Sequence, residues 1–449
     1  MSILNFFARN PKTTDKPDLT ADSPAVGACS LEPMPITATI LRQLFPIRNL
    51  SPEELQAFAT QRWAETATAG SFLFHAGKPA DAVFYLLAGR VCIQAAGLDH
   101  EIDATETQAR FPLCASNKLY KVSARTLTDV QYLRVPGQIM DRCSHLEERK
   151  ASRSNPLPSI KQNQDLPEQV RNSRLFQDFC EHFRIDDPRI PTLPDVAIQL
   201  RKAVEKNSDI REIAHIVQMD PGIAAKIISV ANSPLYSAAK PIETCQDAIL
   251  RLGLVAVRSL VMALSVRSLF QGGNSQVTKL LREQWEQSLY RSTLCHVLAS
   301  HTLSISPEQA LLAGLFSDIG VVPFLYFADS YPGQGIQPGE IEAILPHVRG
   351  PLGTFLLAKW GVPEEFVPIP VLSEQWLYTE GEKLTLADIV ILAKLHTYIG
   401  TPMQAQLPHI DSIPAYSKLT DSRLSPSMSL QFLHEARDRV REAVQIMRA

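Results

Sequence analysis

The stretch from Ile190 to Gly253 constrains the fold most, because signals that start and stop helices recur in it at short intervals. Asp220 is a good N-cap residue, and Pro221 suits the first helical turn, where its missing N–H is not needed. The apolar residues that follow recur at helical spacing up to Asn232. Gly253 stands where a glycine often ends a helix. The stretch therefore predicts several short helices, each with one buried face.

Four motifs in this region share an order and a spacing with a known family: Leu193-Pro194, Asp220-Pro221, Ala231-Asn232-Ser233 and Arg251-Leu252-Gly253. Together they resemble the HDOD domain, a bacterial signalling and output module related to the HD metal-dependent phosphohydrolases. The resemblance covers about residues 185–400 and implies an all-α domain. The predicted interaction residues are the motif residues Asp220, Pro221, Asn232, Ser233, Arg251 and Gly253. Caps and turns that build the fold explain the same residues without any partner.

The overall composition is that of an ordinary globular protein of 449 residues, a length that allows two to four domains. With 45% hydrophobic and 20% charged residues and a net charge of −3, the chain has no basic excess of the kind that binds nucleic acid. Its seven cysteines are dispersed, as in proteins with reduced thiols. No apolar run is long enough to span a bilayer. We therefore expect a cytoplasmic protein with no membrane span, no bound nucleic acid and no cofactor.

Residues 36–143 have a different pattern, in which short alternating apolar runs are separated by glycine turns. The run from Ala69 to Val91 resembles the cyclic-nucleotide-binding domain family. This resemblance implies a small antiparallel β-roll, or jelly roll, with a flanking helix.

The cyclic-nucleotide resemblance fails where the ligand would be held. Those domains use a glycine, a glutamate and an arginine, because backbone amides and a guanidinium must converge on one phosphate. This chain has no glycine in 98–136 and no glutamate in 107–146. The cations left in the degenerate pocket are Lys118, Lys121 and Arg125, and Lys118 near the arginine position is a point charge rather than a fork. We therefore predict that the β-roll does not bind a cyclic nucleotide.

The catalytic site implied by the HD relationship is also incomplete. HD phosphohydrolases place a histidine, a His-Asp pair and a later aspartate around a metal ion that activates water. This chain contains no His-Asp dipeptide. By the resemblance, Gln287 replaces the first histidine and Ser317 the histidine of the pair, which leaves Asp318 and Asp388 as carboxylate ligands. An amide and a hydroxyl are poor substitutes for two imidazoles, so we predict no catalytic residues and no metal.

The predicted fold class is multidomain α+β, with an N-terminal antiparallel β-roll followed by an all-α HDOD domain. A disordered tail precedes the roll, and a polar linker with a connecting helix separates the two domains. An extension with an amphipathic helix follows, which caps the HDOD domain or mediates self-association. The limits of these five segments are 1–35, 36–143, 144–184, 185–400 and 401–449.

The predicted function is that of a bacterial regulatory protein whose HDOD domain is a non-catalytic output module for signalling partners. In this interpretation the β-roll is a sensory or docking module. The first alternative is a divergent metal-dependent phosphohydrolase that uses Asp318 and Asp388. The second alternative is a nucleotide sensor that binds through Lys118, Lys121 or Arg125 of the β-roll.

Overall fold

A computed structural model shows two compact units. It describes residues 29–60, 62–95, 98–115, 119–140, 143, 160, 166–182, 193–232, 241–270, 275–302, 304–331, 336–337 and 339–419. The first unit is formed by Met1–Arg149, Gln375–Lys383 and Tyr398–Leu430, and the second by Lys150–Glu374, Leu384–Thr397 and Gln431–Ala449. Most of the predicted tail and linker, and the predicted C-terminal helix, lie outside the described residues.

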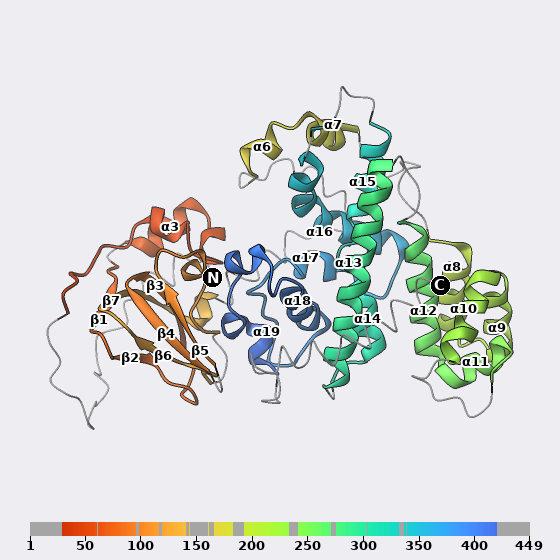
Figure 1. The fold of residues 1–449 in the computed structure, drawn as a ribbon, viewed down its shortest axis with the longest axis horizontal. Coiled ribbons are helices and arrows are strands. Elements are labelled where there is room, and N and C mark those ends of the chain that lie inside the picture. Colours follow the sequence, from red (N-terminus) through yellow and green to blue (C-terminus); the bar gives the residue numbers. More distant parts are fainter. Residues whose placement is uncertain are drawn as a thin grey trace. The chain divides into compact units, whose positions relative to one another are not determined.

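The first unit contains two antiparallel sheets, drawn in orange in Figure 1. One sheet has the strand order β1 (Glu65–Ala67), β7 (Val130–Pro136) and β3 (Ala82–Ala88). The other has the order β2 (Phe72–Phe74), β6 (Ser123–Thr126), β4 (Arg90–Ala95) and β5 (Leu98–Asp103). The flanking helices are α2 (Ala38–Leu41), η1 (Ile47–Asn49), α3 (Pro52–Ala59) and η2 (Thr107–Arg110). The predicted antiparallel β-roll is thus confirmed.

Helix α3 begins and packs as its sequence predicts. Ser51 and Glu54 form a capping box, in which each backbone N–H donates to the other residue's side chain at 3.0 and 3.3 Å. The apolar face of α3, with Phe58, packs on the sheet around the buried Tyr85. The Tyr85 hydroxyl donates to the carbonyl oxygen of Phe45 at 2.6 Å. The helix therefore closes one side of the roll.

A segment far along the chain completes the first unit. It includes η4 (Pro402–Gln406), η5 (Ile410–Ser412) and α19 (Pro414–Ser417). The ammonium group of Lys121 donates to the carbonyl oxygens of Tyr416 and Leu419 at 2.9 and 2.7 Å. The described part of the predicted C-terminal extension, 401–419, therefore packs with the β-strands, a placement that no local pattern in the sequence indicates.

The second unit is helical throughout its described residues and is built around the long helix α13, as Figure 1 shows. In chain order its helices are α6 (Glu168–Arg171), α7 (Arg174–His182), α8 (Asp195–Glu205), α9 (Ile210–Gln218), α10 (Pro221–Ala231), α11 (Cys245–Leu252), α12 (Leu254–Ser268), α13 (Ser275–Ser300), α14 (Pro307–Phe316), α15 (Val321–Asp329), α16 (Glu340–Trp360), α17 (Ile369–Leu372) and α18 (Leu386–Thr397). The predicted all-α domain is confirmed, and its short helices α8 to α11 gather beside α12.

Two glycines let the central helices of this unit approach closely. A Cβ atom added at Gly314 of α14 would lie 2.6 Å from the Cα atom of Ser292 in α13. One added at Gly320, just before α15, would overlap the backbone carbonyl oxygen of Arg349 and the amide nitrogen of Gly353 in α16. Both positions require glycine for steric reasons, because backbone atoms cannot move aside as a flexible side chain can.

Among the described residues, the segment Pro307–Asp329 has the length and hydropathy of a membrane span. The bent pair of α11 and α12 would pass the same test only as a broken span. In the Pro307–Asp329 segment, 89% of the apolar window is buried inside the unit. Its hydropathy is therefore accounted for by burial among the other helices.

We expect the substitution Gly320→Ala to destabilise the helical unit by about 1–3 kcal/mol, because the new methyl group must displace backbone of α16. Chemical unfolding followed by the helical circular dichroism signal measures this change. Gly222→Ala in α10 is the matched control, since its Cβ would meet only the Asp220 carboxylate, at 3.3 Å. Equal stability of Gly320→Ala and the wild type would contradict the close packing described here.

Candidate functional site

Asp220, Pro221 and Asn232 of the HDOD motifs have roles in building the fold. Asp220 caps α10, accepting a hydrogen bond from the Ile223 N–H at 3.0 Å, and Pro221 is the first residue of that helix. The Asn232 amide joins the end of α10 to the loop before α11, accepting from the Ile242 N–H at 2.8 Å and donating to its carbonyl at 2.7 Å. These contacts account for three motif residues as caps and connectors.

The remaining motif residues lie at the junction of two helices or outside the described chain. Arg251 is exposed on the last turn of α11. Gly253 has φ +79 between α11 and α12, a conformation that favours glycine. Ser233 lies outside the described residues.

Lys121 and Arg125, the predicted pocket cations that the structure describes, have different surroundings. Lys121 is engaged by the carbonyl groups of 398–419, as described above. Arg125 is exposed on β6, whereas its neighbours Ala124 and Thr126 are buried. Lys118 lies outside the described residues. The alternation along β6 therefore places Arg125 on the outer face of its sheet.

The four residues predicted from the HD relationship have different surroundings in the helical unit. Ser317 and Asp318 are buried where α14 ends. Asp388 is also buried, but its carboxylate caps α18, accepting hydrogen bonds from the N–H and the hydroxyl of Thr385, both at 2.8 Å. Gln287 is exposed on α13, so the side chain that faces Ser317 and Asp318 from that helix is not Gln287 but Arg291.

A buried ionic cluster surrounds Asp318, and we call it the Asp318 cluster. The Arg291 guanidinium donates to Asp318 Oδ2 at 2.5 Å and to the Ser317 hydroxyl at 3.1 Å. Lys394 of α18 lies with its Nζ 3.5 Å from Asp318 Oδ1 and is also hydrogen-bonded to Glu374. Arg349 of α16 donates to Glu374 Oε2 at 2.9 Å. The cluster therefore joins α13, α14, α16 and α18 through three cations and two carboxylates.

The electrostatics of the cluster favour ionised carboxylates. Burial alone would raise the pKa of Asp318, but the charges of Arg291, Lys394 and Arg349 lower this pKa well below its usual value. The pKa of Glu374 is lowered too, because Arg349 and Lys394 outweigh its burial. The stabilisation by Asp318 is therefore fully present above its ordinary pKa, about 4, and is lost as the pH falls toward the lower folded-state value.

Arg291, Arg349, Glu374 and Lys394 are not among the site residues predicted from the sequence. For Arg291 and Lys394, the sequence nevertheless contains a signal of a buried charge. Arg291 and Lys394 are single cations on helix faces that are otherwise apolar or small, and their side chains are 3% and 0% exposed. Such a charge must be paired when the helix is buried, although the sequence does not say with which residue.

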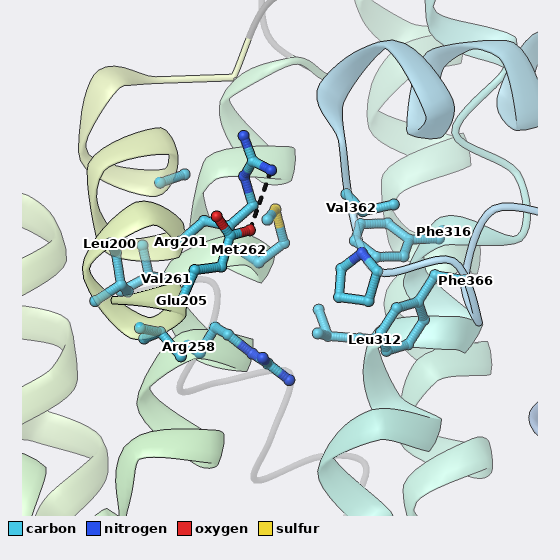
Figure 2. Close-up of a pocket in the computed structure, with 13 residues that line it drawn as sticks. Leu200, Arg201, Glu205, Arg258, Val261, Met262, Leu312, Phe316, Val362 and Phe366 are labelled. Atoms are coloured by element: carbon cyan, nitrogen blue, oxygen red, sulfur yellow. Dashed lines mark hydrogen bonds and ion pairs between the residues drawn. The ribbon is translucent and has the colours of Figure 1, made fainter. Parts of the chain in front are cut away.

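A separate pocket of about 100 Å³ lies in the same unit, between α8 and α12 on one side and α14 and the loop 362–366 on the other. Figure 2 shows Leu200, Val261 and Met262 facing Leu312 and Phe366 across it. These walls are apolar. A cavity of this size accommodates one apolar side chain or a similarly small group, and is smaller than the usual pocket for a nucleotide-sized ligand.

The two arginines that line the pocket differ in their hydrogen bonds and ion pairs. Arg201 of α8 lies 3.3 Å from the Glu205 carboxylate and donates to the Gly361 carbonyl oxygen at 2.9 Å. The guanidinium of Arg258 points from α12 into the space between the two walls in Figure 2. Within the described part of the chain, no hydrogen bond or ion pair is formed by Arg258. The pocket thus combines apolar walls with one guanidinium able to bind an anion.

We expect Asp318→Asn to destabilise the helical unit by about 3–5 kcal/mol, because it leaves buried Arg291 and Lys394 without their carboxylate. The free energy of unfolding, measured with denaturant, tests this. Glu283→Gln is the control, since Glu283 pairs with Lys279 at 3.8 Å on the exposed surface and such pairs contribute little. A loss no larger than that of Glu283→Gln would contradict the importance of the cluster.

The helical unit is similar to known proteins. Residues 190–371 match the family model of the HDOD domain. An uncharacterized protein of Treponema pallidum is 26% identical over 218 residues, which make up 44% of this chain and 39% of that protein. The match therefore spans well under half of that relative's length.

Two solved structures are similar to the chain. An HDOD domain protein with unknown function from Geobacter sulfurreducens is 21% identical and covers 61% of this chain and 97% of its own, with a TM-score of 0.48. A candidate metal-dependent phosphohydrolase from Shewanella amazonensis is 25% identical and covers 56% of this chain and 92% of its own, with a TM-score of 0.46. The match of residues 190–371 to the family model confirms the predicted resemblance: the chain contains an HDOD domain.

Proposed function

We propose that this chain is a non-catalytic regulatory protein whose HDOD domain acts by binding a partner protein. The main support for this proposal is the Asp318 cluster. At the position where the HD relationship implies a metal-binding carboxylate, the cations that neutralise Asp318 belong to the protein itself.

The charges around Asp318 argue against metal-assisted hydrolysis at this position. Both carboxylate oxygens face cations, since Oδ2 accepts from Arg291 and Oδ1 lies 3.5 Å from Lys394. A divalent ion would have to displace these groups, and it would meet a cluster that already has one cation more than it has carboxylates. Asp388 is committed to the cap of α18. Among the described residues, no set of three metal-type ligands converges on Asp318.

The pocket supports a binding role for the helical unit. Its apolar walls and the guanidinium of Arg258 suit a partner that inserts one apolar side chain next to a carboxylate. Buried apolar anchors and arginines contribute most of the binding energy in many protein interfaces. In this proposal the β-roll is the sensory or docking module that accompanies the output domain.

If the proposal is correct, the full-length protein supplied with Mg²⁺ or Mn²⁺ will not hydrolyse a cyclic dinucleotide or bis(p-nitrophenyl) phosphate. The rate of product release measures this, with Asp318→Asn and Glu283→Gln assayed beside the wild type. Metal-dependent turnover that persists in Glu283→Gln and is lost in Asp318→Asn would overturn the proposal in favour of a divergent phosphohydrolase.

The binding role predicts a partner that depends on Arg258. The immobilised full-length protein is exposed to a lysate of its source organism, and bound proteins are quantified by mass spectrometry. We expect Arg258→Glu to reduce capture of this partner about tenfold or more, since reversing one contacting charge readily costs the 1.4 kcal/mol that this factor requires.

The control for this experiment is Arg282→Glu, which reverses an exposed charge on α13 away from the pocket. Circular dichroism establishes that both variants are folded. If the wild type, Arg258→Glu and Arg282→Glu retain the same proteins in the same amounts, the pocket is not the binding site.

A further inference from the structure

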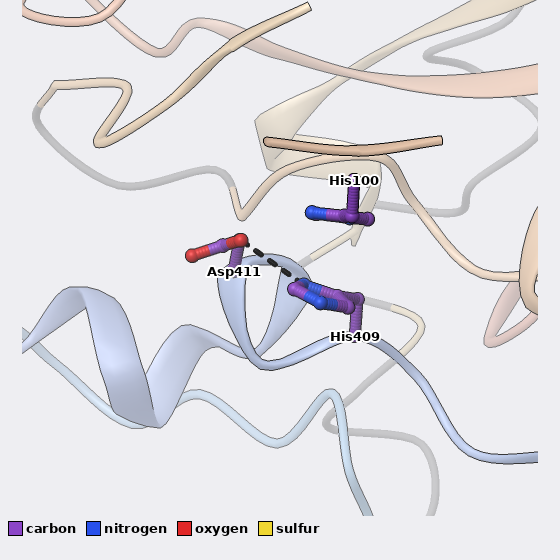
Figure 3. A group of neighbouring side chains, drawn as sticks. All are labelled: His100, His409 and Asp411. Atoms are coloured by element: carbon purple, nitrogen blue, oxygen red, sulfur yellow. Dashed lines mark ion pairs between the residues drawn. The ribbon is translucent and has the colours of Figure 1, made fainter. Parts of the chain in front are cut away.

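Three side chains of the first unit converge at the edge of the β-roll. His100 comes from β5, and His409 and Asp411 come from the η5 region about 300 residues later in the chain. The two imidazole rings stack with their centroids 3.5 Å apart and their planes at 19°, as Figure 3 shows. One potential ligand atom from each of the three residues lies within 4.8 Å of the other two.

Four polar atoms of this group are buried without hydrogen-bond partners in the described structure. They are Nε2 of His100, Nδ1 of His409 and both carboxylate oxygens of Asp411. Nδ1 of His409 lies 3.0 Å from Oδ2 of Asp411 but does not form a hydrogen bond with it. The Asp411 side chain is only 1% exposed. Burying a carboxylate without a partner is costly, so its surroundings call for a cation.

Lys121, which interacts electrostatically with Asp411, is already engaged. Its ammonium group donates to the carbonyl oxygens of Tyr416 and Leu419. Lys121 therefore binds the backbone of the 398–419 segment. It does not form a hydrogen bond with either oxygen of Asp411.

We propose that His100, His409 and Asp411 bind a divalent transition-metal ion, with Zn²⁺ as the best fit. Two imidazole nitrogens and one carboxylate oxygen are a common donor set for Zn²⁺, and three protein ligands leave a fourth position for water or another group. The site is separate from the Asp318 cluster and does not depend on the function proposed for the helical unit.

The ligand atoms are close enough to share an ion once the stacked rings turn out of their nearly parallel arrangement. Ligand atoms about 2.0–2.1 Å from a tetrahedral Zn²⁺ are roughly 3.4 Å from one another. Those of the three side chains are within 4.8 Å now. Because the χ2 torsion of histidine has a broad minimum, rotation of the stacked rings can turn both nitrogens toward a shared ion.

A bound ion at this place would cross-link two distant parts of the chain. It would join β5 of the roll to the segment 398–419, which Lys121 also holds. Metal binding therefore stabilises the attachment of this segment, because an ion that binds only the folded arrangement favours it by mass action.

The test uses the full-length protein, purified without a polyhistidine tag and stripped of metal with a chelator. Zn²⁺ is titrated in competition with a chromophoric indicator, and Co²⁺ is then added to report the ligand geometry through its visible absorption. We expect one high-affinity ion per chain, the absorption of four-coordinate Co²⁺, and a higher melting temperature of the β-roll unit with Zn²⁺.

Single substitutions assign the site to these residues. His100→Gln, His409→Ala and Asp411→Asn should each weaken Zn²⁺ binding at least tenfold and abolish the Co²⁺ absorption band. His75→Ala is the matched control, since His75 is exposed in the same unit and stacks on Phe72. No stoichiometric binding by the wild type, or equal binding by His409→Ala and His75→Ala, would overturn the proposal.

Discussion

The helical unit depends on the pairing of three cations with two carboxylates, Asp318 and Glu374, which are buried or partly buried. Three cations and two carboxylates come from helices that are distant in the sequence, so the cluster forms only when α13, α14, α16 and α18 are in place. Desolvating each ion is costly, and the cluster is tolerated because every carboxylate faces more than one cation. Removing a single partner leaves an uncompensated buried charge, which is costly.

The same cluster changes what the position of Asp318 can do chemically. A carboxylate that faces an open, neutral or acidic surrounding can bind a metal ion, whereas one held by a guanidinium and an ammonium is already neutralised. In the function proposed above, Asp318 is held by a guanidinium and an ammonium group of the protein rather than by a metal ion. Helix α14 links the two features of the unit, because Leu312 and Phe316 line the pocket while Ser317 and Asp318 follow directly in the cluster.

The β-roll unit uses polar groups for a different purpose. Lys121, which the sequence assigned to a degenerate nucleotide pocket, instead holds the carbonyl groups of a segment nearly 300 residues away. His100, His409 and Asp411 meet at the same attachment of 398–419 to the strands. These polar groups thus lie where the segment is attached, whereas the roll itself is packed by apolar and aromatic side chains around Phe74, Phe84 and Tyr120.

The sequence by itself determined the local elements and the class of each domain. The capping signal at Asp220, the helix-ending glycine at Gly253 and the alternating strands of the roll are short-range features, and each occurs as expected. The two domain types also followed from motifs that are local or regularly spaced.

Only the tertiary structure decided which charges meet. The face of α13 toward Asp318 carries Arg291 rather than Gln287, because the rotation of a long helix is fixed by its packing and cannot be read from the spacing of one motif. Lys394 and Arg349 reach Asp318 from elements up to 76 residues away, and Glu374 joins the cluster through these two cations. His100 and His409 are brought together across still longer separations. Such contacts depend on the path of the whole chain, for which local sequence patterns contain no signal.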